Sequence, residues 1–233
     1  MQTKPKPCKA IGKALGFNSC GKITPFRKFG LCMSCYPKFI METEAGKLIM
    51  QKAILKVQKP RLEETKSNNK KLRIEIMSND EYRKTYIQPV INKIARLIDF
   101  GQPCIATKRY GKMAGGHFYS VGSNRTTALN LHNIHIQNFE SNGMSGGDPL
   151  LYIDGLKDTY GNDYFDFVTS LKKTPILKLK KSEMIEIYSR AKIIVLKLQK
   201  DLKELTPTER INARNEFNTF LNIYEEDYCI FKY

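Results

Sequence analysis

Four of the six cysteines lie in the first 35 residues, and their spacing constrains the fold more than any other feature of the sequence. Cys8 and Cys20 are followed by a Cys32-x-x-Cys35 pair, which comes shortly after Gly30. A Cys-x-x-Cys turn presents two sulfurs at the separation that a tetrahedral metal ion needs, and two further cysteines complete the site. So short a segment cannot bury a core of its own, so metal binding would also fold it. The spacing predicts a structural zinc ion on these four cysteines, with reduced free thiols as the alternative.

The formal net charge is +16, and the excess is concentrated towards the N-terminus. Residues 1–80 hold 17 Lys and Arg against 6 Asp and Glu. Such a segment attracts phosphate, so we expect a nucleic-acid partner, with a solvated basic face as the alternative. A membrane is disfavoured because the longest apolar runs are too short to span a bilayer. Since no apolar leader follows the first residues, we expect a cytosolic, reducing compartment, which favours metal ligation over disulfides.

Basic and aromatic residues alternate between the second cysteine and residue 39. Nucleic-acid-binding modules combine cations that contact phosphates with rings on which bases stack. We therefore expect DNA contacts from Lys22, Arg27, Lys28 and Lys38, and stacking from Phe26, Phe29, Tyr36 and Phe39.

Composition and pattern divide the chain into four regions. These are a zinc module at 1–41, a basic arm at 42–79, a central domain at 80–172 and a helical region at 173–233. Together they predict a mostly helical α+β protein.

The arm has a lysine-rich helical pattern that is interrupted at Pro60. We expect the helix to end or kink there, and residues 67–69 predict a flexible joint. The arm would either lie along a phosphate backbone or act as a solvated linker.

Helix signals are clear after residue 77. Ser78 and Glu81 have capping-box spacing, and apolar residues then recur at helical spacing to Gly101, with a kink expected at Pro89. Residues 148–162 predict a compact, turn-rich segment.

The C-terminal region predicts two helices, one at 182–205 and a second that starts at the capping box of Thr206 and Glu209. A helical hairpin follows, which would serve as core, as a brace or as the surface of a homodimer.

The stretch from 104 to 148 contains all three histidines: His117 after a Gly-Gly pair read as a turn, and His132 and His135 beside Asn133. With these motifs, the Cys8, Cys20, Cys32-x-x-Cys35 element and the Gly-rich segment 145–147, the sequence resembles the NinG/Rap family of phage recombination proteins. That family belongs to the HNH nuclease superfamily, which has a ββα-metal fold. The resemblance extends to about residue 200.

The resemblance implies roles for particular residues. His117 matches the general base that deprotonates a water, and Asn133 matches the asparagine that orients the loop. Asn142 matches a ligand of a catalytic Mg²⁺ or Mn²⁺, with Asp148 as a possible further donor. The two remaining histidines are expected to be structural or to contact phosphate rather than to bind metal. Arg109 and Arg125 are further candidates for DNA contacts.

Two departures from the family pattern stand out. Members commonly carry a second zinc ribbon, but only Cys104 of its four sulfurs is present, so we expect a buried free thiol and ordinary packing there. An acidic ligand often precedes the base, whereas here Ala114 and two glycines stand before His117.

Three functions remain open. The first is a metal-dependent, structure-specific endonuclease that cuts branched DNA, such as a Holliday junction or D-loop. The second is a related scaffold that binds branched DNA without cutting it. The third is a zinc-containing adaptor protein, which leaves the charge unexplained.

Overall fold

The computed structural model describes residues 4–144 and 148–232 and has the mostly helical α+β fold that the sequence predicts. The chain divides into two compact units, Met1–Glu75 and Ile76–Tyr233. The regions 80–172 and 173–233 both belong to the second unit. No helix within the described ranges has the length and apolar character needed to cross a membrane.

The first unit begins with a small cysteine-centred module. Strands β1 (Lys6–Pro7) and β2 (Ile23–Thr24) pair antiparallel, a 3₁₀ turn spans Gly12–Ala14, and helix α1 covers Cys35–Glu42. Its small core gathers Leu31 and Phe39 around three of the cysteines. So little apolar area cannot stabilise a fold alone, which is consistent with a need for metal.

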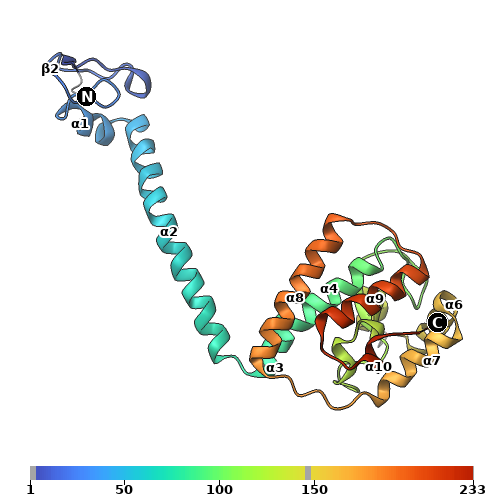
Figure 1. Ribbon diagram of the computed structural model, residues 1–233. Coiled ribbons are helices and arrows are strands. Elements are labelled where there is room, and N and C mark those ends of the chain that lie inside the picture. Colours follow the sequence, from blue (N-terminus) through green and yellow to red (C-terminus); the bar gives the residue numbers. More distant parts are fainter. Residues whose placement is uncertain (1–3, 145–147, 233) are drawn as a thin grey trace. The chain divides into compact units, whose positions relative to one another are not determined.

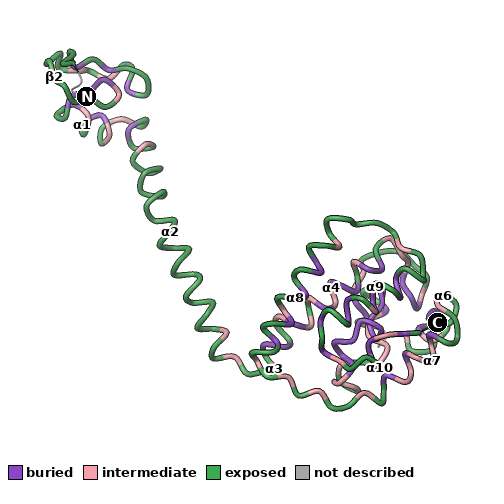
Figure 2. The backbone as a smooth tube through the Cα atoms, in the orientation of Figure 1, coloured by how far each residue is buried: buried purple, intermediate pink, exposed green. Residues whose placement is uncertain are grey.

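Helix α2 (Glu44–Ile76) follows and runs through Pro60 without ending (Figure 1). The helix therefore does not end at Pro60, which was one of the two outcomes expected there, and the predicted joint at 67–69 is wrong. Proline removes one backbone hydrogen bond and leaves the carbonyl of Lys56 without its N–H partner. Because α2 is exposed along almost its whole length (Figure 2), water can bind that carbonyl and the helix tolerates the loss.

The second unit opens with a nearly continuous helical run. It consists of α3 (Asn79–Tyr82), a π-helical turn (Arg83–Ile87) and α4 (Gln88–Ile98). The capping box at Ser78 is confirmed, since its hydroxyl accepts from the N–H of Glu81. The π turn precedes Pro89, which stands in the first turn of α4, where a missing N–H costs little.

A β-hairpin packs against α4. Strand β3 (Met113–His117) pairs antiparallel with β4 (Ile134–Asn138), so that His117 faces Ile134 at the loop end and Met113 faces Asn138 at the other. Two 3₁₀ turns, Thr127–Leu129 and Leu131–Asn133, lie in the connecting loop. Helix α5 (Phe139–Met144) continues from β4, which completes the β-β-α order.

The glycines before His117 lie in strand β3 and do not form the expected turn. A side chain at Gly116 would come within 2.0 Å of Gln137 Oε1, and one at Gly115 would approach Asn92 of α4 to 3.1 Å. Gly115 thus allows the hairpin to pack closely on α4, and Gly116 leaves room for the side chain of Gln137 in β4.

Residues 149–170 form helices, so the predicted turn-rich segment is wrong. Helix α6 spans Pro149–Tyr160 and α7 spans Asn162–Ser170. Gly155 lies inside α6. Any side chain at this position would clash with the backbone carbonyl of Ile105, so glycine is required there. This glycine serves packing rather than a turn.

The last helices close the core. A 3₁₀ turn covers Leu171–Lys173, followed by α8 (Lys181–Lys200), α9 (Pro207–Leu221) and α10 (Glu226–Cys229). The Thr206 capping box is confirmed. Helix α8 packs on both α4 and α9, so the predicted hairpin forms part of the core.

The hairpin and its surrounding helices are joined by ordinary packing, as expected. Cys104 is a buried free thiol, and Ile105, Ile134 and Ile136 are buried near it. Phe139 does not take part as predicted, because it is 55% exposed.

Candidate functional site

The four N-terminal cysteines come together. The sulfurs of Cys8, Cys20, Cys32 and Cys35 all lie within 4.8 Å of one another. Cys20 is exposed and the other three are buried. Four thiolate donors at this spacing match the requirements of a tetrahedral structural metal site. Within the described part of the chain, no other group of three or more His, Cys, Asp or Glu side chains is close enough to bind a metal ion.

The backbone of the Cys32-x-x-Cys35 turn favours thiolate at its first cysteine. The N–H of Cys32 donates to Cys8 Sγ at 3.2 Å. Backbone N–H groups of the turn, that of Cys35 foremost, lower the pKa of the Cys32 thiol to about 6. Gly30 has a φ of +79° and lies against the carbonyl of Lys9, so only glycine fits there. Burial and the neighbouring sulfurs raise the pKa of the Cys35 thiol to about 12, so the turn favours thiolate at Cys32 and not at Cys35.

The predicted DNA-contacting residues of this module differ in their surroundings. Lys22, Arg27, Lys28 and Lys38 are all exposed. Phe26 is 70% exposed, whereas Phe39 is buried in the core, so the prediction that Phe39 stacks on a base is wrong. Phe29 and Tyr36 are half-buried, and Lys28 Nζ lies 4.9 Å from the centre of the Tyr36 ring.

Helix α2 carries a basic stripe that sequence reasoning missed. Its members recur every three or four residues, which places them on one helix face over roughly 30 Å. A single acid, Glu63, interrupts them. The stripe consists of the exposed residues Lys52, Lys56, Lys59, Lys66, Lys70 and Arg73. The spacing of these basic residues is visible in the sequence. It places them on one face only if the helix continues through Pro60, which was not expected from the sequence.

His117 is the last residue of β3, and its ring is held from one side. Nε2 lies 3.1 Å from the carbonyl oxygen of Ala128 and 3.0 Å from Gln88 Nε2. The two contacts favour opposite tautomers. The Ala128 carbonyl can only accept, which suits a proton on Nε2, whereas the Gln88 amide nitrogen can only donate, which suits a lone pair on Nε2. Burial lowers the pKa of His117, and the nearby charge of Arg83 adds to that effect, so the ring is neutral at physiological pH.

The turn that holds His117 is itself held by the C-terminal segment. The Tyr224 hydroxyl donates to the carbonyl of Thr126 at 2.7 Å and accepts from the N–H of Leu129 at 3.2 Å. The carbonyl that orients the histidine therefore lies between two anchored residues.

Asn133 links the two sides of the loop. Its Nδ2 donates to the carbonyls of Tyr119 and Thr127 at 3.1 and 3.2 Å, and its Oδ1 accepts from the N–H of Tyr119 at 2.8 Å. The side chain is fully buried, so it can shape the loop but does not face a substrate.

The expected metal donors lie on and beyond α5. Asn142 is half-buried on that helix, and Asp148 Oδ2 accepts a hydrogen bond of 2.6 Å from Ser141. Asp148, Ser141, Glu140 and the predicted DNA contact Arg109 line one cavity of about 530 Å³. His117 is not in its lining, and within the described residues no hydrogen bond joins His117 to Asn142 or Asp148.

His132 and His135 are structural, as expected. Both are fully buried, and their rings make hydrogen bonds to Tyr164, at 3.0 and 3.3 Å. Nε2 of His132 also bonds the carbonyl of Cys229, and Nδ1 of His135 bonds Tyr152. Burial lowers the pKa of His132 to about 3 and that of His135 well below its usual value.

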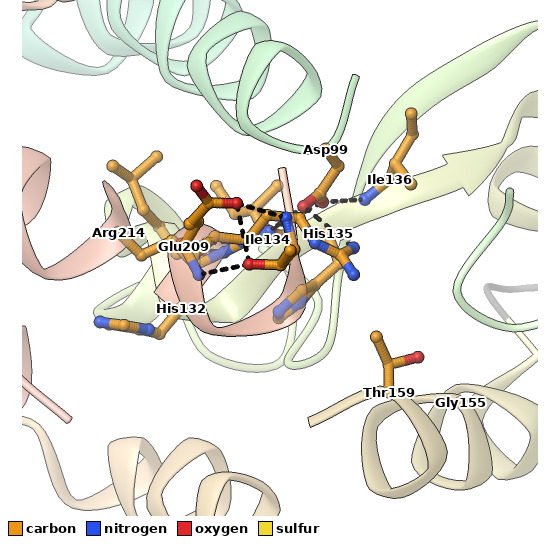
Figure 3. A network of polar contacts seen from close by, with 12 residues as sticks. Asp99, His132, Ile134, His135, Ile136, Gly155, Thr159, Glu209 and Arg214 are labelled. Atoms are coloured by element: carbon orange, nitrogen blue, oxygen red, sulfur yellow. Dashed lines mark hydrogen bonds and ion pairs between the residues drawn. The ribbon is translucent and has the colours of Figure 1, made fainter. Parts of the chain in front are cut away.

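Beside these histidines lies a buried ion pair, shown in Figure 3. Asp99 at the end of α4 accepts from Arg214 of α9, and the same carboxylate accepts from the N–H of Ile136 in β4. Sequence reasoning missed both charged residues because 115 positions separate them.

Two other arginines of the second unit differ in their burial. Arg125, a predicted DNA contact, is exposed and forms an ion pair with Asp80. Arg83, on the π turn, is buried and was not singled out from the sequence. The sequence signal that could have identified Arg83 is that an arginine stands at a position of the helical pattern where an apolar residue is expected.

A family model described as Bacteriophage Lambda NinG protein matches residues 19–203. No curated protein and no solved structure matches the chain.

Proposed function

Since this chain belongs to the bacteriophage lambda NinG family of recombination-related phage proteins, we propose that it is a metal-dependent endonuclease that cuts branched DNA. The observation that carries the proposal is the state of His117. It ends the first strand of a β-β-α unit and is neutral. In the tautomer that we propose, Nε2 donates to the Ala128 carbonyl, so that Nδ1 can accept a proton.

In this mechanism Nδ1 of His117 takes a proton from the water that attacks the phosphodiester. Asn133 and the anchored 126–129 turn keep the ring from rotating. A neutral imidazole with a lowered pKa is ready to act as a base at physiological pH. The unit would then be HNH-like, as the resemblance implies.

A divalent ion, Mg²⁺ or Mn²⁺, would stabilise the charge that develops on the phosphate. The cavity beside α5 fits such an ion, because it is lined by the carboxylates of Glu140 and Asp148 and by the Ser141 hydroxyl. Magnesium is commonly held by one or two carboxylates together with water and substrate phosphates. Asn142, on the same helix as Glu140, is the further donor that we propose.

The N-terminal part would hold the DNA. The four-cysteine cluster would bind structural zinc, and the exposed cations of its module and the α2 stripe would contact phosphates without reading sequence. The homodimer expected through the C-terminal helices stays a prediction.

The test is cleavage of a synthetic four-way junction in Mg²⁺ or Mn²⁺. We expect nicking by the unaltered protein and a loss of about 100-fold or more in His117→Ala, since general bases contribute that much. Gln199→Ala, an exposed change on α8, is the control. Junction binding measured in parallel must be retained in His117→Ala. Cleavage that is unchanged by His117→Ala would remove this residue as the base.

A second function is favoured by one observation. The lining of the carboxylate-lined cavity does not include His117, so the proposed metal donors and the proposed base do not share one cavity. A protein that binds branched DNA without cutting it would show tight binding to the junction and no products in any divalent metal.

A further inference from the structure

A second cavity, of about 270 Å³, adjoins the turn that holds His117. It lies among α3, the π turn, the 3₁₀ turn at 127–129, the segment 177–179 and α8. Three cations line it, Arg83, Arg125 and Lys178, against one acid, Asp80. Asp80 is already paired with Arg125, so it does not neutralise Arg83.

Arg83 is the unusual member of this lining. Its side chain is buried, with 9% of the residue exposed, yet Nε and Nη1 make no hydrogen bond in the described part of the chain. Burying a charged group without partners is costly, because its hydration is lost and nothing replaces it. The contrast with Arg214 is direct, since that buried guanidinium has the Asp99 carboxylate and three carbonyls.

The backbone conformation at Arg83 is consistent with a functional role for this residue. Arg83 begins the π-helical turn, a local conformation that is rare and often occurs at functional sites. The turn packs against α8, which makes one wall of the cavity.

The cavity is also next to the proposed base. Leu129 lines it, and the preceding residue, Ala128, supplies the carbonyl that orients His117. Arg83 is near enough to His117 that its charge contributes, after burial, to the lowered pKa of the imidazole.

We infer that this cavity is an anion site in which Arg83 binds a backbone phosphate of a DNA strand. A guanidinium is planar and carries five N–H donors, and the oxygens of a phosphate in this cavity would give the donors of Arg83 a charged acceptor that they otherwise lack. Arg125 and Lys178 stand at the same cavity and add positive charge. The inference rests on the proposed function for the identity of the anion, and it assigns Arg83 a direct contact with substrate beside His117.

The direct test is an NMR titration of the whole protein that follows arginine Nε–H signals. Tetrathymidylate and inorganic phosphate are added in separate experiments, each against sodium chloride at equal ionic strength. We expect the Arg83 signal to shift and saturate with both phosphate ligands. Arg214, whose Nε donates to the carbonyl of Leu131, is the internal control and should not move.

A matched pair of variants adds a functional readout. Arg83→Gln should weaken tetrathymidylate binding about tenfold, as expected for the loss of charge-assisted hydrogen bonds. Arg96→Gln removes the same charge from an exposed position on α4 and should change binding much less. If Arg83→Gln does not fold, the titration of the unaltered protein still decides.

The outcomes separate this inference from the proposed function. An Arg83 signal that ignores both ligands, or one that responds to inorganic phosphate but not to tetrathymidylate, overturns the DNA-phosphate assignment even if the protein cuts junctions. An Arg83 response to tetrathymidylate in a protein that never cuts DNA keeps the phosphate site and rejects the nuclease.

Discussion

Arg214 donates from one nitrogen to both carboxylate oxygens of Asp99, at 2.8 and 2.7 Å, in a part of the core where both side chains are essentially inaccessible to water. The pair joins α4 to α9, and Arg214 also donates to the carbonyls of Leu131 and Ile134 beside the hairpin. Residues beyond the family-matched segment therefore hold the hairpin in place.

Removing one member of this pair should be severe. Arg214→Met removes the close partner of Asp99 and leaves Arg210, at 3.8 Å, as the other buried counter-charge. Breaking a buried ion pair typically costs about 3–5 kcal/mol, and we expect a loss towards the lower end because Arg210 remains. Urea unfolding followed by circular dichroism measures the loss. The matched control is Lys197→Met, which breaks an exposed pair with Glu216 and should cost less than about 1 kcal/mol. Equal losses in the two variants would contradict the role given to Arg214.

Stability should fall in mild acid because of the two buried histidines. Their pKa values are lowered in the folded protein, to about 3 for His132, so only the unfolded chain takes up protons below the usual value of 6.5. The contribution of the neutral histidines to the free energy of unfolding is fully present above pH 6.5 and is lost as the pH falls towards 3. Each histidine should cost about 1 kcal/mol per pH unit below 6.5. Unfolding at pH 7.5, 6 and 5 tests this, and a stability that is flat over that range would contradict it.

The cysteine cluster predicts one zinc ion per chain by elemental analysis. Cys32→Ser should abolish zinc binding and unfold the first unit, because thiolate ligation supplies most of its stability. Cys229→Ser, at a buried cysteine in the second unit, should retain the metal. Two zinc ions per chain would show that the ligand assignment is incomplete.

The basic stripe on α2 predicts a salt effect on duplex binding. Replacing Lys59 and Lys66 with Gln should reduce the slope of log affinity against log salt by about 0.9 for each phosphate that is no longer neutralised. The control replaces Arg61 and Lys71, which carry the same charge on other faces of the helix. Equal changes in slope would mean that total charge, rather than the stripe, determines binding.

Local signals in the sequence were sufficient for part of the structure. The cysteine spacing predicted the cluster, and the Ser78 and Thr206 capping boxes predicted two helix starts, because neighbouring residues determine each of them. The structural character of His132 and His135 also followed from their exclusion from the catalytic pattern.

Non-local contacts explain the failures. Residues 148–162 suggested turns, but Gly155 within them is a helical residue that packs against the carbonyl of Ile105, fifty positions away. Pro60 suggested a break, but an exposed helix can hydrate the lost hydrogen bond. Arg83 is distinguished only by its burial without partners, which depends on the assembled core.

The anchoring by Tyr224 and Arg214 has a consequence for the order of events during synthesis. Asp99 leaves the ribosome 115 residues before Arg214, and Leu129 leaves 95 residues before Tyr224. Until those late residues arrive, a charged carboxylate lacks its partner and the turn beside His117 lacks its clamp. The hydrogen bonds that hold the turn beside His117 are therefore complete only after residue 224 has been synthesised, so this turn acquires its anchor later than the strand that carries the histidine.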